Sequence, residues 1–265
     1  MNNLYFFIGY PKTASTFLFN KLKKDERIQT SSSKDTHLFS NNFKKSYLDN
    51  LKNNLNKNKP NAEFDHDLVF YMDNIIHINT HIPGTKFVLV VRDYESHIIS
   101  NFLYQVSQGK FNFNKEDFKK FTIDEKENFQ NIDHIKFLNE NLRSEDLLII
   151  KYELLQKNPQ EFLDKIYKFM GLEDVNYEHN NIIVNQARLP IYNKIIYVFL
   201  RKIGNQIKKI SPKTHHSIKN NKFISSILFK EIKNKNIMRD ITLSYFDSDF
   251  VEHVKRNQEK LNELL

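Results

Sequence analysis

The stretch LYFFIGYPKTASTFLFNKLKK, residues 4–24, decides the fold of this chain. Its apolar beginning, residues 4–8, predicts a buried strand, and from Ser15 onward the apolar residues recur at helical spacing. A strand that runs through a tight loop into a helix presents the backbone N–H groups of the first helical turn, and the helix dipole favours negative charge there. The stretch therefore predicts a strand–loop–helix unit that binds an anion.

Side chains of the loop strengthen this prediction. Lys12 adds a positive charge, and Thr13, Ser15 and Thr16 add hydroxyl groups that can donate to phosphate or sulfate oxygens. The loop is P-loop-like but is not a Walker A motif, because Lys12 lies three residues after Gly9 and no second glycine precedes it. An ordinary turn whose Ser and Thr residues cap the helix is the competing interpretation.

The chain around this stretch alternates between strand-like and helix-like segments. Strands are expected at residues 28–32, 86–93 and 146–153, and helices at 43–57, 94–108, 128–142 and 158–170. The segment KFVLVVRD, residues 86–93, is apolar without interruption at its centre, as in a parallel strand buried on both faces. This alternation predicts a three-layer α/β fold, in which an open parallel sheet lies between two layers of helices.

No Pro-, Gly- or Ser-rich linker divides the chain, so we expect one domain over residues 1–265. Strand-like patterns stop near residue 188, which separates an α/β core, residues 1–187, from a helical C-terminal extension, residues 188–265. The segment 188–235 contains twelve Lys or Arg residues and a single acid, Glu231. Its basic amphipathic helix either packs on the core with solvated lysines or docks on an anionic membrane or an acidic glycan.

The composition restricts the partners and the chemistry. The chain has 40 Lys and Arg against 32 Asp and Glu, and its formal charge of +8 favours nucleotides, nucleic acid, acidic glycans or anionic lipid as partners. The absence of cysteine excludes disulfides, thiolate metal sites and cysteine nucleophiles. No apolar run reaches the length of a membrane span, and the start lacks the basic region of a signal peptide. We therefore expect a cytoplasmic protein, peripheral at the membrane if the basic helix docks there.

A second anion-binding position is expected after the strand at residues 86–93. Arg92 follows the apolar run, and ligands bind at the carboxyl ends of strands in open α/β sheets. Its guanidinium can pair bidentately with phosphate, and Ser100 follows two helical turns later. An isolated Arg at a strand end is more often a surface ion pair. Two anion-binding patterns in this order, about 80 residues apart, favour a phosphate-rich ligand instead.

These patterns resemble two motifs of the sulfotransferases that depend on 3′-phosphoadenosine 5′-phosphosulfate (PAPS), in particular bacterial and glycan-type members. The segment GYPKTASTF, residues 9–17, resembles their 5′-phosphosulfate loop, Y-P-K-[ST]-G-[ST]-T-[WF]. The segment RDYESHIIS, residues 92–100, resembles their 3′-phosphate motif, R-[ND]-P-x-x-R-x-x-S, with His97 in place of the common second Arg. The resemblance covers roughly residues 4–172.

The resemblance implies a role for each residue that matches the family. The implied PAPS-binding residues are Lys12, Thr13, Ala14, Ser15 and Thr16 around the 5′-phosphosulfate, Phe17 and Tyr152 near the adenine, and Arg92, Ser100 and Arg188 at the 3′-phosphate. Ala14 stands where the family usually has Gly, so a positive φ at this position would strain the loop. A packed core position is the alternative for Tyr152, and a solvated surface position is the alternative for Arg188.

Sulfuryl transfer requires a general base for the acceptor and a fixed cation for the leaving oxygen. Lys12 fits the second role. For the first, the segment SKDTHLF, residues 33–39, resembles the K-E-x-H-F-F segment of glycan sulfotransferases, with Asp35 in the acid position. His37 is the rival base, because an imidazole has an unperturbed pKa near 6.5. A second polar segment, Asp-His-Asp at residues 65–67, precedes the strand expected at residues 86–93 and either lines the acceptor pocket or forms a solvated loop.

The function implied by the resemblance is transfer of the sulfuryl group from PAPS to a hydroxyl or amine, on a carbohydrate, a glycolipid or another small molecule, leaving adenosine 3′,5′-bisphosphate. No metal is expected, because the donor is already activated and the sequence contains no metal-ligand motif. Nucleic acid is not expected as a partner. The alternatives are a kinase-like P-loop enzyme acting on nucleosides or nucleotides, and a basic protein without catalytic activity that binds membranes or nucleic acid.

Overall fold

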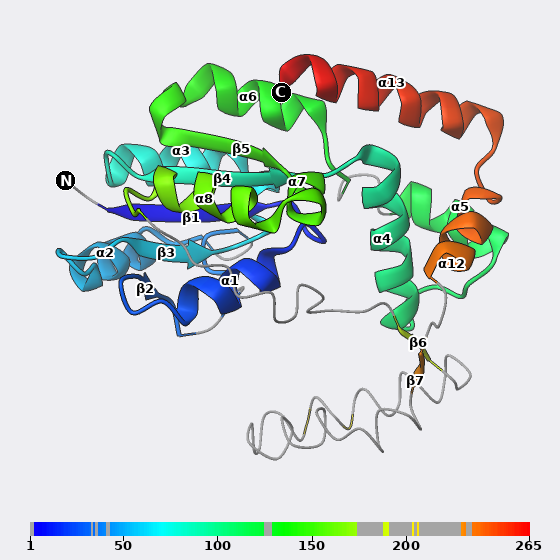
Figure 1. Ribbon diagram of the computed structural model, residues 1–265, viewed down its shortest axis with the longest axis horizontal. Coiled ribbons are helices and arrows are strands. Elements are labelled where there is room, and N and C mark those ends of the chain that lie inside the picture. The colour runs from blue at the N-terminus through cyan, green and yellow to red at the C-terminus, as the bar shows by residue number, and fades with distance from the viewer. Residues whose placement is uncertain are drawn as a thin grey trace. The chain divides into compact units, whose positions relative to one another are not determined.

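The computed structural model of the chain describes residues 3–32, 34, 37–40, 43–124, 129–173, 188–190, 203, 206, 229–231 and 235–265 (Figure 1). The chain forms two compact units. The first unit consists of residues 1–97, 130–185 and 254–265, and the second consists of residues 98–129 and 186–253. The expectation of a single domain with a core over residues 1–187 stays a prediction.

The first unit is built on a sheet of five parallel strands. The strands are β1 (Leu4–Gly9), β2 (Gln29–Thr30), β3 (Asn61–Phe64), β4 (Lys86–Val91) and β5 (Leu147–Lys151), in the order β2-β3-β1-β4-β5. All four neighbouring pairs are parallel, which confirms the expected α/β class. The sequence indicated every strand of this sheet except β3, whose four residues, NAEF, form no apolar run.

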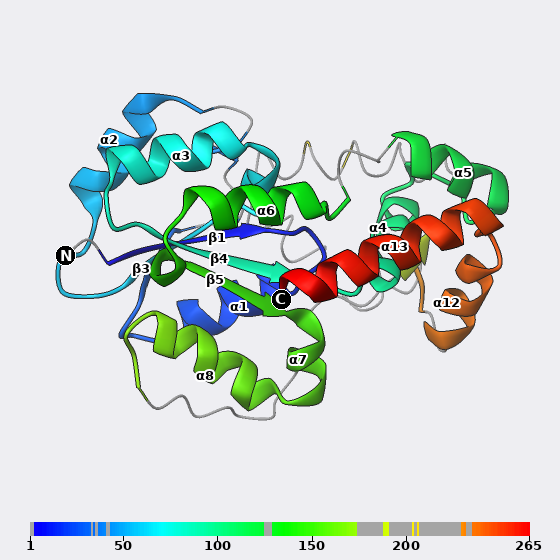
Figure 2. The same cartoon turned by 90° about the horizontal axis from the view of Figure 1, so that it is seen from above.

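Helices cover both faces of the sheet, which confirms the three layers. One layer contains α2 (Lys45–Asn54), α3 (Met72–His81), α6 (Ile132–Asn141) and the C-terminal part of α13 (Ser248–Leu264), and the other contains α1 (Ser15–Lys23), α7 (Tyr152–Lys157) and α8 (Pro159–Phe169) (Figure 2). Successive residues of a strand point to opposite faces, so Phe6 packs in the first layer and Phe7 in the second. β1 and the part of β4 after Lys86 are therefore apolar on both faces.

The end of β1 departs from regular geometry where the loop of residues 10–14 begins. The register of β1 against β4 shifts between Phe7 and Gly9, and Gly9 has a φ of 144°. A Cβ atom on Gly9 would lie 2.7 Å from Val69 Cγ1 and 2.9 Å from the backbone oxygen of His66. Only glycine fits this position, because another residue would need both the unusual φ and the missing space.

The second unit contains α5 (Lys115–Asp124), α12 (Lys235–Leu243) and the adjoining parts of α4 (Tyr94–Ser107) and α13. Its core is aromatic: Phe118 packs edge to face on Phe102 at 5.1 Å and stacks on Phe246 at 5.1 Å. The C-terminal part is helical in α12 and α13, as expected. It also contains a short antiparallel pair, β6 (Arg188–Pro190) and β7 (Phe229–Glu231), which no sequence pattern indicated.

Two expectations remain, one about the basic helix and one about membrane-spanning segments. Most of the basic amphipathic helix expected around residues 196–210 lies outside the described residues. Within the described part of the chain, no helix combines the length and the apolar character needed to cross a lipid bilayer.

Candidate functional site

The loop after β1, residues 10–14, lies where the strand order of the sheet reverses. From β1 the chain continues to β2 and β3 on one side, and it later forms β4 and β5 on the other. Ligands of open α/β sheets bind outside the carboxyl ends of the strands at such a reversal. The Tyr10 amide donates a hydrogen bond to the Val90 backbone oxygen at 3.1 Å, so the loop begins attached to β4.

The backbone of this loop is held in a left-handed conformation at two positions. Lys12 has a φ of 68° and Ala14 has a φ of 70°. Ala14 is the N-cap of α1, where it provides no side-chain hydrogen bond, and the first turn of α1 contains no acidic residue. The N-cap is therefore not a Ser or Thr, which argues against the competing interpretation as an ordinary capped turn. The positive φ also explains why the family prefers Gly where this chain has Ala14.

Buried side chains anchor the loop from α6 and α4. Tyr10 is fully buried; its hydroxyl donates to the Asn131 backbone oxygen at 3.0 Å, and its ring stacks on His134. Nε2 of His97 lies 2.9 Å from the backbone oxygen of Pro11. The Thr13 hydroxyl, expected to face phosphate, donates to the Tyr10 backbone oxygen, and Thr13 is buried. The side chain of Thr13 thus shapes the loop from inside.

His97 stands where the family commonly has a second Arg, and here it supports the loop. Burial, opposed by the hydrogen bond to the Pro11 oxygen and reinforced by the charges of Arg92 and Lys12, lowers the pKa of His97 to about 4. His97 is fully buried and therefore neutral at neutral pH. Since a carbonyl oxygen can only accept, its Nε2 carries the proton that is donated to Pro11.

Arg92 reaches the same loop from the end of β4. Its Nη1 donates to the Lys12 backbone oxygen at 3.2 Å, and its guanidinium carbon lies 4.5 Å from the centroid of the Tyr152 ring. The amide of Gln130 fixes the backbone of Arg92 on both sides: Arg92 N donates to Oε1 at 2.9 Å, and Nε2 donates to Arg92 O at 3.0 Å. Gln130 is buried, and no sequence pattern singled it out.

The site concentrates positive charge. Burial, followed by the charges of Arg92 and Lys34, lowers the pKa of Lys12 to about 8. A lysine whose pKa is lowered by burial and by neighbouring cations gains from a bound anion, because the anion offsets both effects. Perturbed groups of this kind are concentrated at functional sites. The geometry therefore brings together three of the predicted residues, Lys12, Arg92 and Tyr152.

A second group of ionisable side chains consists of His37, on the segment after β2, and Asp65, His66 and Asp67, on the segment after β3. Nδ1 of His37 lies 3.1 Å from Asp67 Oδ2 and 4.0 Å from Asp65 Oδ1, and Nε2 of His66 lies 3.4 Å from Asp67 Oδ1. Asp65 is buried, and its Oδ2 accepts from the amides of Phe39 at 3.2 Å and Ser40 at 3.0 Å. The interpretation as a solvated loop is therefore wrong for Asp65.

This His–Asp group is adjacent to the end of β1. A Cβ atom on Gly9 would lie 2.9 Å from the His66 backbone oxygen, so this part of the segment 65–67 lies close against the strand that leads into the Lys12 loop. The Asp65 amide donates to the Phe7 backbone oxygen at 3.2 Å. Burial, more than any other factor, raises the pKa of Asp65. The Lys12 loop, which follows β1, and residues 65–67, which follow β3, thus come after neighbouring strands.

The other predicted site residues lie on α1, α4 and β6, or outside the described residues. Ser15 and Thr16 form the half-buried first turn of α1, and Phe17 is buried in the layer that contains α1 and α8. Ser100 lies in the part of α4 that belongs to the second unit, and Arg188 begins β6 in that unit, so their pairing with Arg92 stays a prediction. Asp35 lies outside the described residues.

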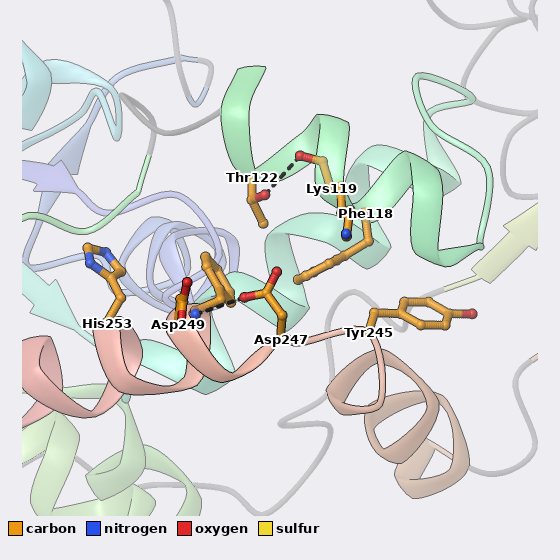
Figure 3. A pocket seen from close by; sticks show the side chains of 8 residues that line it. Phe118, Lys119, Thr122, Tyr245, Asp247, Asp249 and His253 are labelled. Carbon is orange, nitrogen blue, oxygen red and sulfur yellow. Dashed lines mark hydrogen bonds between the residues drawn. The ribbon is translucent and has the colours of Figure 1, made fainter.

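The second unit contains a separate pocket of about 290 Å³ (Figure 3). It is lined by Phe118, Lys119, Thr122, Tyr245, Asp247, Asp249, Phe250 and His253, none of which the sequence predicted as functional. Asp247 Oδ1 accepts from the Phe250 amide at 2.9 Å and thereby caps the start of α13. Over the described ranges, no group of three His, Cys, Asp or Glu side chains is arranged to hold a metal.

The fold of the chain is similar to that of solved sulfotransferases. The chain is similar in fold to the sulfotransferase from Alicyclobacillus acidocaldarius, at 13% identity, with 78% of this chain and 94% of that chain covered and a TM-score of 0.57. It is also similar to mouse sulfotransferase SULT7A1, solved as a complex with PAP, at 16% identity, with 98% and 84% covered and a TM-score of 0.55. No curated protein matches the chain.

A family model described as the sulfotransferase family matches residues 29–176. The match covers more than half of the 265 residues and includes β3, β4 and β5, together with the His37 segment and Arg92. The chain therefore belongs to the sulfotransferase family.

Proposed function

We propose that this sulfotransferase takes the sulfuryl group from PAPS and transfers it to a hydroxyl or amine. The observation that carries the proposal is the position of Lys12 and Arg92 at the carboxyl ends of the neighbouring strands β1 and β4, where Arg92 Nη1 donates to the Lys12 backbone oxygen at 3.2 Å. Burial, followed by the charges of Arg92 and Lys34, lowers the pKa of Lys12 to about 8. PAPS carries anionic groups at both its 5′ and 3′ positions and matches this concentration of charge. The PAP complex of the mouse protein with the same fold supports the choice of nucleotide.

The residues present fit PAPS. Lys12 and the first turn of α1 would hold the 5′-phosphosulfate, because the helix N-terminus and the ammonium group both favour negative charge. Arg92 would hold the 3′-phosphate, with its backbone fixed by Gln130 and its guanidinium supported by the Tyr152 ring. Ser100 and Arg188 remain the proposed partners of Arg92 at that phosphate.

PAPS supplies an activated sulfuryl group joined to its 5′-phosphate through an anhydride oxygen. Lys12 stabilises the negative charge that develops on this oxygen, and it is fixed in position before the reaction because His97, Tyr10 and Arg92 anchor its loop. An anion beside Lys12 also raises its pKa from about 8, so that the residue is fully charged at neutral pH. The chain therefore provides the cation that the leaving oxygen requires.

His37 is the base that the geometry supports. It lies on the segment that leads from β2, with its side chain 39% exposed and therefore open to an acceptor. Asp67 and Asp65 lie beside its Nδ1, where they stabilise the imidazolium that forms when His37 takes a proton. Asp35 stays the alternative base. A carbohydrate or glycolipid acceptor is proposed from the likeness of residues 33–39 to glycan sulfotransferases.

A direct test uses PAPS labelled with sulfur-35 and a panel of glycans, glycolipids, small alcohols and amines. We expect label to be transferred to at least one acceptor class, with loss of transfer in Lys12→Ala and in Arg92→Ala. A parallel reaction with ATP labelled at the γ-phosphate and Mg²⁺ tests the kinase alternative. Transfer of phosphate in place of sulfate would overturn the proposal.

A further inference from the structure

We infer that Asp67 is a positioning residue that fixes the tautomer of His37, so that Nε2 is the atom that takes the proton of the acceptor. This inference rests on the proposed function, in which His37 is the base. It starts from a short distance: Nδ1 of His37 lies 3.1 Å from Asp67 Oδ2. The two residues are 30 positions apart in sequence, and the ends of β2 and β3 bring them together.

The chemistry of the pair determines where the proton lies. The two atoms are at ion-pair distance, and among the described residues Nδ1 has no partner in a well-aligned hydrogen bond. A lone pair on Nδ1 would face the negative charge of Asp67, whereas an N–H group there is attracted to it, so a neutral imidazole favours the proton on Nδ1. Nε2 then holds the lone pair. The side chain of His37 is 39% exposed, so one edge of the ring remains open to an acceptor while the other faces Asp67. Asp67 therefore makes His37 a base at a defined atom.

Neighbouring groups hold both members of the pair. Asp65 fixes the backbone next to His37 by accepting from the amides of Phe39 and Ser40. Asp67 is held on its other side, where Oδ1 lies 3.4 Å from His66 Nε2, and the rings of His66 and His37 meet edge to face at 5.7 Å. The titratable groups that face His37 from the segment after β3 are thus Asp65, His66 and Asp67.

The step balances in atoms and charge. The acceptor oxygen or nitrogen forms a bond to sulfur, and its proton moves to His37 Nε2 while the Nδ1 proton stays in place. The bond from sulfur to the bridging oxygen breaks, and its electron pair remains on the 5′-phosphate. The imidazolium formed next to Asp67 and Asp65 later loses its Nε2 proton to water, which restores the starting tautomer.

A purely structural role for Asp67 predicts a different behaviour. The Asp67 side chain is 27% exposed and the His37 side chain is 39% exposed. Exposed ion pairs contribute little to stability, so Asp67→Asn should leave the unfolding transition nearly unchanged. The chain also offers a matched control, because His81 Nε2 lies 2.7 Å from Asp49 Oδ1, in a His–Asp pair on α2 and α3 that has no proposed role.

The first readout is the tautomer of His37, measured by nitrogen-15 NMR of the full chain with assignment by His37→Gln. We expect the Nδ1–H form in the wild type and a shift toward Nε2–H in Asp67→Asn, with Asp49→Asn unchanged at His37. An Nε2–H tautomer in the wild type would overturn the inference. This readout does not depend on an acceptor being found.

The second readout is kcat at saturating PAPS and acceptor. Asp67→Asn should lower kcat by about 100-fold, the lower end of what a positioned general base contributes. Asp67→Glu should recover part of the loss, and Asp49→Asn should match the wild type. An unchanged kcat in Asp67→Asn contradicts the inference. Absence of transfer by a wild type that shows the Nδ1–H tautomer contradicts the proposed function instead.

Discussion

Nη1 of Arg92 donates a hydrogen bond to the backbone oxygen of Lys12 at 3.2 Å, so the residue that follows β4 holds the loop that follows β1. The two residues are 80 positions apart, and each belongs to a motif that the sequence indicated independently. Their contact is a consequence of the strand order, in which β1 and β4 are neighbours with parallel carboxyl ends. It joins the two expected phosphate positions into one site.

Replacing Lys12 by Met should stabilise the ligand-free protein while removing its response to nucleotide. Burial and the charges of Arg92 and Lys34 disfavour the charged form of Lys12, so at pH 7 its loss should raise the free energy of unfolding by about 1–2 kcal/mol. Urea unfolding at pH 7 measures this, with the exposed Lys136→Met as control. A Lys12→Met protein less stable than the wild type would show that the charge is stabilised in the free protein.

Nucleotide binding should take up a proton at mildly alkaline pH. In the free protein the pKa of Lys12 is about 8, so at pH 8.5 much of the population has a neutral amine. A bound phosphate favours the charged form and raises this pKa, and the proton comes from the buffer. Calorimetry of adenosine 3′,5′-bisphosphate binding in buffers of different ionisation enthalpy measures the uptake. It should vanish in Lys12→Arg; equal uptake by that variant would assign the proton to another group.

Gly9→Ala should destabilise the protein by about 2–4 kcal/mol, because the new Cβ meets Val69 and the His66 backbone at a φ of 144°. Gly84→Ala is the matched control: Gly84 also has a positive φ, 82°, but a Cβ there meets nothing within 4 Å. It should cost only about 1 kcal/mol. Thermal unfolding of both variants measures the two losses of stability. Similar losses would show that the close packing between β1 and residues 66–69 contributes nothing to stability.

His97 should make the protein sensitive to acid. Its pKa falls from 6.5 in the unfolded chain to about 4 in the folded protein, so the unfolded state binds more protons between these values and stability falls as the pH drops from 6.5 to 4. The loss should reach about 3 kcal/mol below pH 4. His97→Leu should be less stable at pH 7, because Pro11 loses its donor, yet depend less on pH over this window. Urea unfolding from pH 4 to 7 compares the slopes; identical slopes would contradict the assignment.

The sequence predicted the elements that carry strong local patterns. β1, β4 and β5 are apolar runs, and the loop after β1 carries its Lys and hydroxyl residues within five positions, so their periodicity and composition indicated them. β3 has four residues, one of them Glu63, and is recognised only through its pairing with β1 and β2. A strand stabilised by its neighbours leaves no local signal of this kind.

Contacts between residues distant in the chain could not be predicted from the sequence. Gln130, which no sequence pattern singled out, holds the backbone of Arg92 from 38 residues away. Asp67, which the sequence assigned either to the acceptor pocket or to a solvated loop, faces His37 from 30 residues away. An amide or a carboxylate acquires its partner only from the fold. His97 was noticed as a replacement for Arg, but its contact with Pro11 follows from the position of α4 beside the loop. The sequence predicted which residues bind phosphate, which stays a prediction, but it could not predict the contacts that hold these residues in place.

The most direct test of the central claim, that Lys12 and Arg92 form one site for a nucleotide with both 5′ and 3′ phosphates, is thermal unfolding with adenosine 3′,5′-bisphosphate, ADP, or ATP with Mg²⁺. At a concentration of 100 times its dissociation constant, a ligand should add about 2.7 kcal/mol to the free energy of unfolding. We predict that the bisphosphate stabilises the wild type more than the other two do, and that Lys12→Ala and Arg92→Ala both lose this effect. Equal or greater stabilisation by ATP with Mg²⁺, or a bisphosphate effect that survives in both variants, would contradict the account.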